Sequence, residues 1–377
     1  MEISTFDFLK NKKVLVTGHT GFKGSWLSLW LEMIGAKVYG ISDLIPTVPA
    51  LFESLQLEKK IEHILLDIRD YKATQSEILR IQPDFIFHLA AQPIVSTSYS
   101  DPIGTLNTNI MGTAHVADAM RKLQDKCVGV FITSDKCYEN VEWEWGYKET
   151  DSLGGKDVYS GSKAGAEIVF HSYFHSFFSK TENIRVATGR AGNVIGGGDW
   201  AKDRIVPDCI RAWIKKEKVE IRNPKATRPW QHVLEPLSGY LTLAQSLNSS
   251  DQHNGESFNF GPPAENNISV LELLEELSLR FGFNSSDDAY FYNKDAFFPE
   301  AGLLKLNCDK ALFRLKWKPN LNLKELIDFT GHWYWNNQSR EEDMIAYTSN
   351  QIKDFVNLAR DRKINWANPA EIITSKS

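Results

Sequence analysis

The sequence predicts an α/β protein with a doubly wound parallel sheet and a smaller, mixed α/β lobe at its carboxyl end. Apolar runs of strand length alternate with helical patterns up to about residue 190, and a glycine triplet separates the first strand from the first helix. Alternation of this kind favours parallel strands, which need a crossover between them. We expect residues 1–190 to form the sheet domain and residues 191–377 to form the second lobe, with a return to the sheet near residues 230–262.

The predicted elements of the first domain are short and evenly spaced. We expect strands at Lys13–Thr17, Lys37–Ile41, Ile61–Asp67, Asp84–Leu89, Val128–Ile132 and Ile184–Gly189. We expect helices at Ser25–Ile34, Tyr71–Ile81, Ile103–Lys122 and Val158–Phe178. The first of these helices stops at Gly35, since glycine is a common residue just past a helix end.

After residue 190 the alternation breaks down. The stretch 191–204 is rich in Gly, Asn and Asp, which is typical of loops. Apolar periodicity then predicts helices at Val206–Lys216, Leu234–Leu247, Ser269–Phe281, Leu323–Trp335 and Glu341–Ala359. The apolar run Ser257–Phe260 is the segment that we expect to return to the first sheet.

Composition excludes several classes of protein. The 377 residues include 43 Lys and Arg against 48 Asp and Glu, without basic clusters, so we expect no nucleic-acid partner. The four cysteines lie far apart without CxxC spacing, which argues against zinc or disulfide frameworks and fits a reducing compartment. We therefore expect no metal. No apolar run reaches transmembrane length and no signal segment opens the chain, so we expect a cytoplasmic protein without a membrane partner.

The glycine triplet predicts a dinucleotide site. Gly18, Gly21 and Gly24 come directly after the first strand and open a helix. Glycine allows a tight turn and lets the backbone approach a pyrophosphate at the helix N-terminus, as in Rossmann-type domains.

Two carboxylates close the next strands. Asp43 lies nineteen residues past Gly24, where an acid accepts hydrogen bonds from an adenosine ribose and favours NAD over NADP. The alternative is that Asp43 only begins a turn after Ser42. Asp67 closes the third strand and is a further candidate for the adenine pocket.

Tyr159 and Lys163 predict an acid–base pair. They stand at positions i and i+4 of a helix, so their side chains share one face. An isolated tyrosine has a pKa of about 10, and a neighbouring ammonium would lower that value. The alternative is a surface pair, because the Tyr-x-x-x-Lys spacing often arises by chance.

The segment Thr133–Tyr138 follows the fifth strand and is the most unusual part of the sequence. Ser134, Asp135 and Lys136 place a hydroxyl, a carboxylate and an amine at successive positions. Ligands bind at the carboxyl edge of open α/β sheets, so we predict a catalytic site here. The alternative is a polar loop with a local Asp–Lys pair.

Together these motifs resemble the extended short-chain dehydrogenase/reductase family, over almost the whole chain. The resemblance rests on Gly18-x-x-Gly21-x-x-Gly24, Ala90-Ala91, Ser134, Tyr159-x-x-x-Lys163 and the stretches at residues 19–27, 190–200 and 228–233. Within the family, the Asp135-Lys136 pair is typical of enzymes that dehydrate a nucleotide-linked hexose. Other dehydratases of the family carry Glu where this chain has Lys136, and simple epimerases lack the acid–base pair.

The resemblance implies NAD as cofactor and a nucleotide sugar as substrate. The residues implied to contact NAD are Gly18, Thr20, Gly21, Phe22, Lys23, Gly24, Asp43, Asp67, Ile68, Ala90, Ala91, Gln92, Tyr159 and Lys163. Tyr159 would take the proton of the sugar 4-hydroxyl, which Ser134 hydrogen-bonds. Lys136 would then remove the C5 proton while Asp135 protonates the departing 6-hydroxyl. Lys136 can act as a base only if its surroundings lower its pKa.

Further expectations concern the substrate lobe and the assembly. The resemblance implies that Asn193, Arg204 and Arg228 contact the nucleotide and that His232 faces the sugar. Alternatively, Arg204 pairs with Asp203 or Asp208, Asn193 serves a turn, and His232 is structural. The helices Ile103–Lys122 and Val158–Phe178 would pair across a homodimer or a dimer of dimers, or would pack only on their own sheet.

Two other functions remain open at the level of the sequence. One is another nucleotide-sugar enzyme of the same family, either an epimerase or a dehydratase of a different substrate. The other is a catalytically idle NAD-binding regulator, which the intact Ser134, Tyr159 and Lys163 disfavour.

Overall fold

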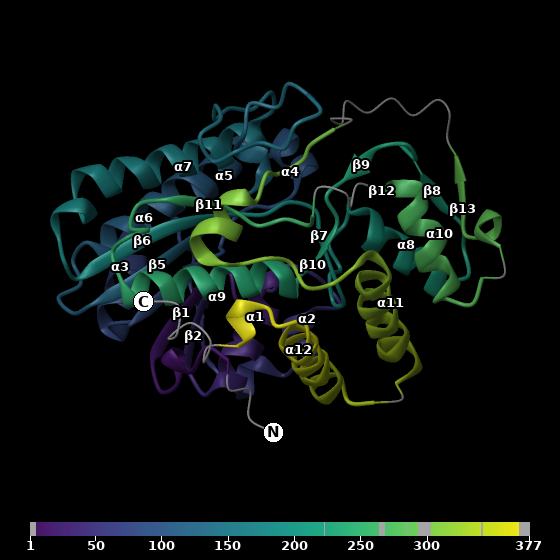
Figure 1. Ribbon diagram of the computed structural model, residues 1–377, viewed down its shortest axis with the longest axis horizontal. Helices are drawn as coiled ribbons and strands as arrows, with labels where there is room; N and C mark the ends of the chain where they lie inside the picture. Colours follow the sequence, from purple (N-terminus) through teal and green to yellow (C-terminus); the bar gives the residue numbers. More distant parts are fainter. Residues whose placement is uncertain are drawn as a thin grey trace.

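The central sheet has seven parallel strands, flanked by helices on both faces (Figure 1). The computed structural model describes residues 5–221, 223–263, 268–283, 285–292, 303–340 and 342–368. The strand order is β11-β6-β5-β4-β1-β2-β3. The strands are β1 (Lys13–Thr17), β2 (Lys37–Ser42), β3 (Glu62–Leu65), β4 (Phe85–His88), β5 (Cys127–Ile132), β6 (Ile184–Arg190) and β11 (Ser257–Asn259).

The strand register brings the carboxyl ends of the strands to one edge. Thr17 of β1 lies opposite Ile41 of β2 on one side and His88 of β4 on the other. His88 in turn lies opposite Phe131 of β5. Strand order reverses between β1 and β4, and ligands bind at such a switch point in open α/β sheets. The predicted parallel, doubly wound sheet is therefore confirmed.

Two hydrophobic cores cover the two faces of the sheet. Along β1, Val14 and Val16 belong to one core while Leu15 between them belongs to the other, as the alternation of a strand requires. The first core is closed by α1 (Phe22–Ile34), α9 (Leu234–Ser249) and α12 (Met344–Asp361). The second is closed by α3 (Tyr71–Ile81), α6 (Gly112–Met120) and α7 (Val158–Ser176). Figure 1 shows α7 and α9 on opposite sides of the sheet.

Two helices differ from their predicted form. The first helix begins at Phe22 and not at Ser25, because Gly21 caps it through an extended backbone without any side-chain signal. The predicted helix Ile103–Lys122 is divided into α5 (Pro102–Leu106), a π-helical turn (Asn107–Met111) and α6. Such π turns often occur near functional sites.

In its described residues, the second lobe contains helices and three two-stranded sheets. Its helices are α8 (Ile205–Ile214), α10 (Val270–Leu279) and α11 (Leu323–Ser339). The pairs are β7 (Val194–Ile195) with β10 (Gln231–His232), β8 (Val219–Ile221) with β13 (Tyr290–Tyr292), and β9 (Thr227–Arg228) with β12 (Ile268–Ser269). Two short helices, α2 (Leu51–Ser54) and α4 (Val95–Ser100), complete the first part.

Segments beyond residue 190 also complete the first sheet. Strand β11 pairs with β6 in parallel, with Ser257 opposite Thr188, as predicted. Helices α9 and α12 pack on α1, so the two parts of the chain share one core. The domain boundary near residue 190 remains a prediction, and Glu341, where the last helix was expected to begin, lies outside the described residues. Within the described ranges, no helix is both long and apolar enough to span a membrane.

Candidate active site

The glycine loop lies against the loop that follows β4. Gly18 has a φ of +76°, and a Cβ atom there would lie 2.7 Å from the backbone nitrogen of Ala90. A Cβ atom on Gly24 would lie 2.1 Å from the carbonyl oxygen of Gly18. Only glycine fits at these two positions, because backbone occupies the space of a side chain. At the start of α1, Gly21 is the N-cap and no side chain makes a capping hydrogen bond there.

Hydrogen bonds fix the same loop to the second strand. The Thr20 hydroxyl donates to the carbonyl oxygen of Leu44 at 2.7 Å. His19 Nδ1 lies 3.0 Å from the Ser42 hydroxyl, and its Nε2 lies 2.7 Å from Nδ1 of His63. Burial and then His63 lower the pKa of His19 to about 4, so its imidazole stays neutral near neutral pH. Sequence reasoning did not identify His19 as a support of the loop.

The two predicted adenosine carboxylates lie at neighbouring strand ends. Asp43 is exposed just past β2. Asp67 forms an ion pair with Arg69 at 2.6 Å, and the hydrogen bond from Arg69 lowers the pKa of Asp67. The charge of Arg69 also interacts with Asp43. Ile68, which lies between Asp67 and Arg69 in the sequence, is buried. It packs against Gly112, where an added Cβ atom would lie 2.4 Å from the Cδ1 atom of Ile68.

The segment Ala90–Gln92 is held by the π-helical turn. The backbone N–H of Gln92 donates to Oδ1 of Asn109 at 2.8 Å, and Asn109 Nδ2 donates to the Gln92 carbonyl oxygen at 3.1 Å. Asn109 also donates to the hydroxyl of Ser162 on α7 at 2.8 Å. The Gln92 side chain donates to Thr105 at 2.9 Å. Asn109 thus joins the loop after β4 to the helix that carries Tyr159.

The predicted catalytic segment forms a single 3₁₀ turn, Asp135–Cys137, with Ser134 as its N-cap. The Ser134 hydroxyl donates to Oδ1 of Asp135 at 2.9 Å, and Lys136 Nζ lies 3.3 Å from Oδ2. Asp135 is 2% exposed, whereas the Lys136 side chain is 30% exposed. The carboxyl group is therefore buried between the Ser134 hydroxyl and the Lys136 amine. Cys137 is fully buried, which raises the pKa of its thiol and suits a packing role.

Tyr159 and Lys163 lie buried on the first turns of α7. Burial raises the pKa of Tyr159 to about 12, while the charge of Arg204 and the hydrogen bond with Ser134 oppose that shift. Burial lowers the pKa of Lys163 to about 8. Its Nζ atom lies 5.9 Å from the Tyr159 ring centroid. The charge of Arg204 thus also favours the phenolate, and the part that we predict for Lys163 stays a prediction.

Lys23, which is among the predicted NAD contacts, also interacts with the catalytic groups. It lies half-buried between Gly21 and Gly24. Burial lowers the pKa of Lys23 to about 7, and the charges of Arg204 and Lys163 act in the same direction. Asp135 and Asp199 oppose this shift. The Lys23 side chain therefore interacts with the catalytic groups, in addition to any contact that the loop backbone makes with a cofactor.

Arg204 has a different partner from the two that we considered. Its Nη1 donates to Oδ2 of the buried Asp199 at 2.9 Å. Asp203 instead accepts a hydrogen bond from Ser96 at 2.6 Å, and Asp208 pairs with Arg211. The Asp199 carbonyl oxygen accepts from the hydroxyl of Tyr334, which anchors the pair to α11.

The other two nucleotide candidates lie on adjoining segments. Asn193 has a φ of +44°, as in a turn, and its carbonyl oxygen accepts from the Gln231 backbone at 3.3 Å. Arg228 is 9% exposed and donates to the Thr227 carbonyl oxygen at 3.0 Å. The roles of both residues in binding remain predictions.

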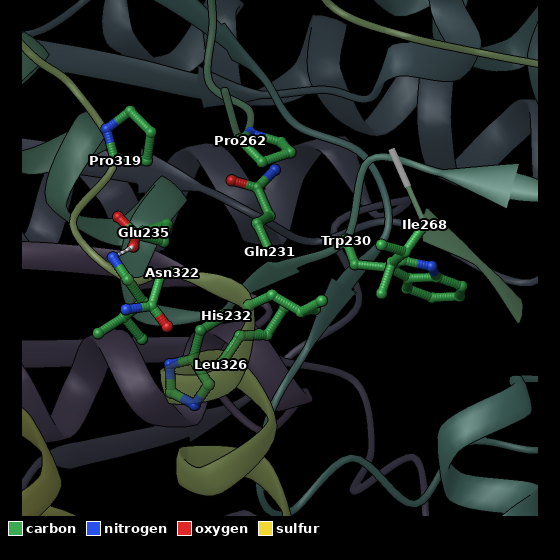
Figure 2. Close-up of a pocket in the computed structure, with 11 residues that line it drawn as sticks. Trp230, Gln231, His232, Glu235, Pro262, Ile268, Pro319, Asn322 and Leu326 are labelled. Carbon is green, nitrogen blue, oxygen red and sulfur yellow. Dashed lines mark hydrogen bonds between the residues drawn. The ribbon is translucent and has the colours of Figure 1, made fainter. Parts of the chain in front are cut away.

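The surroundings of His232 favour its structural alternative. The side chain is fully buried, with its ring 5.8 Å from Trp26 and 5.5 Å from Phe329 between centroids. Burial lowers the pKa of His232 to about 3. The cavity beside it, which Figure 2 shows between Glu235 and Trp230, has a volume of about 20 Å³. That volume holds about one water molecule and is too small for a sugar.

Across the described part of the chain, no group of three or more His, Cys, Asp or Glu side chains is arranged to hold a metal ion.

Comparisons with known proteins agree with this geometry. The sequence profile of the GDP-mannose 4,6 dehydratase family matches residues 15–330. A CDP-glucose 4,6-dehydratase from Salmonella typhimurium is 44% identical over 357 residues, which cover 93% of this chain and 98% of that protein. A dTDP-D-glucose 4,6-dehydratase from Dictyostelium discoideum is 24% identical, over 88% of this chain and 84% of the relative.

Solved structures show the same fold at lower identity. An epimerase from Methanothermobacter thermautotrophicus superimposes with a TM-score of 0.76 and 21% identity, over 90% of this chain and 98% of the other. A dTDP-glucose 4,6-dehydratase from Streptomyces venezuelae, solved with NAD bound, gives a TM-score of 0.73 and 20% identity, over 88% and 99%. The extent of the profile match and the identity to the Salmonella protein show that this chain belongs to the GDP-mannose 4,6 dehydratase family of extended short-chain dehydrogenases/reductases.

Proposed function

We propose that the protein is a CDP-glucose 4,6-dehydratase, which converts CDP-D-glucose to CDP-4-keto-6-deoxy-D-glucose and water. The observation that carries this proposal is the buried Asp135 carboxyl group, which contacts both Ser134 and Lys136. The acid Asp135 and the amine of Lys136 therefore lie next to Ser134, one of the groups proposed to act in oxidation of the sugar 4-hydroxyl. A reaction that combines oxidation with elimination of water requires both sets of groups. The choice of cytidine rests on the 44% identical Salmonella relative.

The residues of the glycine loop fit NAD as the cofactor. Gly18 and Gly24 allow the tight turn that opens α1, and no side chain caps the helix at Gly21, which suits a diphosphate at the helix N-terminus. Asp43 and Asp67, at the ends of β2 and β3, would contact the adenosine half. NAD, when bound, would supply the acceptor for the hydride that leaves C4 of the sugar and the donor of the hydride that returns to C6, so the reaction consumes no cofactor.

The side chains of the chain then have separate tasks. Tyr159 takes the proton of the 4-hydroxyl, Ser134 hydrogen-bonds the same oxygen, and Lys163 supports the phenolate by its charge. The 4-ketone acidifies the C5 hydrogen, whose proton passes to an amine while Asp135 gives a proton to the leaving 6-hydroxyl. The products of this elimination are one water molecule and a 5,6-double bond. Addition of a hydride at C6 and return of the proton from the amine to C5 would then give the 4-keto-6-deoxy sugar.

Two amines are candidates for the C5 base. Lys136 is the predicted one, and its Nζ lies 3.3 Å from the carboxyl group of Asp135. Lys23 is the second, because burial lowers its pKa to about 7 and it interacts with Asp135. If Lys136→Ala retained full exchange of the C5 hydrogen with deuterated solvent while Lys23→Ala lost it, the role would pass to Lys23.

The substrate lobe supplies the remaining contacts in this proposal. Arg204 and Arg228 would bind the diphosphate, since arginine suits phosphate oxygens, and Asn193 would contact the nucleotide. His232 would support the segment that carries Arg228 without touching the sugar.

The helices on the second core support a homodimer, or a dimer of dimers. Tyr99, Ile103, Met111 and Ile168 are 68%, 65%, 47% and 56% exposed. Large apolar side chains exposed together commonly mark an interface between proteins. Light scattering after gel filtration measures the mass and tests this part of the proposal. Free thiols at all four cysteines fit a reducing compartment and support a cytoplasmic location.

A substrate panel tests the function. The purified protein is incubated with NAD and separately with CDP-glucose, dTDP-glucose, UDP-glucose and GDP-mannose. We expect only CDP-glucose to yield a product that is lighter by one water and shows the alkaline ultraviolet absorbance of a 4-keto-6-deoxy sugar. Turnover of another substrate in its place would overturn the cytidine assignment, a product of unchanged mass would indicate an epimerase, and no turnover at all would indicate an idle protein.

A further inference from the structure

A buried ion pair that takes no part in the proposed chemistry lies behind the catalytic segment. Glu167 of α7 and Arg190 at the end of β6 are 0% and 1% exposed. Arg190 Nε donates to Glu167 Oε1 and Nη2 donates to Oε2, both at 2.9 Å. Paired, bidentate geometry of this kind compensates the two charges for the loss of water.

The ion pair contacts both ends of the catalytic segment. The hydroxyl of Thr133, the residue before Ser134, donates to Glu167 Oε1. Arg190 Nη1 donates to the hydroxyl of Tyr138, the residue after Cys137, at 2.7 Å. The four residues 134–137 are thus held at each end by one buried pair.

The same elements also locate the segment relative to the other catalytic groups. Glu167 lies one turn beyond Lys163 on α7, so it shares a helix face with Lys163 and Tyr159. Gly192 follows Arg190 by two residues, and a Cβ atom on it would lie 2.2 Å from Oδ2 of Asp135. The end of β6 therefore limits the position of the Asp135 carboxyl group from a second side.

A further contact extends this arrangement to the second lobe. The Tyr138 hydroxyl donates to Oδ1 of Asn259 on β11 at 2.7 Å. Asn259 Nδ2 donates to the carbonyl oxygens of Tyr147 at 2.8 Å and Asn307 at 3.0 Å. Through Asn259, the catalytic turn therefore contacts β11, which is the last strand of the central sheet in chain order.

We propose that the Glu167–Arg190 pair is a positioning unit that holds Asp135 and Lys136 in register with the sugar during the elimination. This inference rests on the proposed function. Thr133 and Tyr138 fix the two ends of the segment by contacting this pair. Neither residue contacts the substrate in this proposal.

Thr133 offers a test that leaves the ion pair intact. Removing Glu167 or Arg190 would leave a buried, unpaired charge and strongly destabilise the protein. Thr133→Val keeps the side-chain shape but removes the hydroxyl. The matched control is Thr188→Val, because the Thr188 hydroxyl donates to the other oxygen of the same carboxylate, Oε2 of Glu167, at 3.1 Å, from within β6. Thr133→Ser keeps the hydroxyl.

Steady-state kinetics with CDP-glucose gives the first readout. We expect Thr133→Val to lower kcat about tenfold to a hundredfold with KM within about twofold, since small displacements of catalytic groups cost this much. Thr188→Val should keep kcat within about twofold at a similar loss of thermal stability, and Thr133→Ser should restore most of the activity. Equal losses in both valine variants, or full activity in Thr133→Val, would overturn the proposal.

Amide hydrogen exchange gives a second readout, independent of the substrate. We expect faster exchange in a peptide spanning residues 134–138 for Thr133→Val and unchanged exchange there for Thr188→Val. If the wild type fails to dehydrate CDP-glucose, the proposed function fails while this exchange result still decides the positioning role. Unchanged exchange in Thr133→Val would overturn that role.

Discussion

The edge of the sheet and the second lobe hold their candidate residues by different means. At the edge, Ser134 and Asp135 lie just past β5, which pairs with β4 over Val128–Phe131 and with β6 over its whole length. In the second lobe, Arg204 lies at the N-cap of α8 and depends on one ion pair with Asp199, while Arg228 lies in a two-residue strand. Sheet register fixes the groups of the first region, whereas an ion pair and a two-residue strand hold those of the second.

This difference suits the tasks that we propose for the two regions. Proton transfers demand positions accurate to a fraction of an ångström, so they favour groups on rigid elements. Binding a flexible diphosphate tolerates more freedom and is commonly assigned to loops. Substitutions at the sheet edge should therefore mainly reduce kcat, whereas those in the second lobe should mainly alter binding, pH dependence or stability.

The largest effect is expected at Tyr159. Tyr159→Phe removes only the hydroxyl and should lower kcat about 10³-fold, because general acid–base groups contribute factors of about 10² to 10⁴. The ring still packs at the start of α7, so the circular dichroism spectrum should not change. The alkaline absorbance assay measures the loss, and a decrease below about tenfold would remove Tyr159 from the proposed role.

Asp135→Asn should separate the two halves of the reaction. The amide keeps the shape of the buried carboxyl group but cannot give up a proton in the same way, so dehydration should fall about 10²-fold. Oxidation at C4 should persist, because Ser134, Tyr159 and Lys163 are unchanged. Mixing with substrate should then produce the near-ultraviolet absorbance of reduced NAD without loss of water. Loss of both signals would mean that Asp135 also serves the oxidation.

Arg204 links the two regions, so its replacement tests whether they are independent. The Arg204 charge lowers the pKa of Tyr159, and Arg204→Gln should therefore raise that pKa. The acidic limb of the pH profile of kcat/KM, where the phenolate is lost, should move to higher pH, with a raised KM. The matched control is Arg211→Gln on the same helix, whose Nη1 donates to the Trp200 carbonyl oxygen at 2.8 Å and which should leave the limb in place.

The smallest effect is expected at His232 and concerns stability. Its pKa is about 3 in the folded protein and about 6.5 in an unfolded chain, so below pH 6.5 only the unfolded state binds the proton. The wild type should lose up to about 1.4 kcal/mol of unfolding free energy per pH unit from this residue as the pH falls below 6.5. His232→Asn lacks this dependence, so denaturant titrations should show a shallower decline. A raised KM for CDP-glucose in this variant would instead support the prediction that His232 contacts the sugar.

The sequence was most informative where the fold is regular. Strand periodicity and the Gly18–Gly24 spacing predicted which side chains reach the sheet edge, since parallel strand ends converge there. Contacts between distant segments could not be predicted in this way. The Glu167–Arg190 pair joins a helix to a strand 23 residues later, and nothing local marks either residue as buried. The π-helical turn around Asn109 likewise lacks a sequence signal.

The late return of the chain to the sheet has a consequence for synthesis. Strand β6 ends at Arg190, yet its outer neighbour β11 begins only at Ser257. While the chain emerges from the ribosome, β6 therefore remains an open edge until about seventy further residues have been made. Unpaired edges invite wrong pairing, and domains fold as units during translation. Asn259, which ties Tyr138 to the second lobe, also arrives with that strand, so the catalytic turn is completed at the same moment as the sheet.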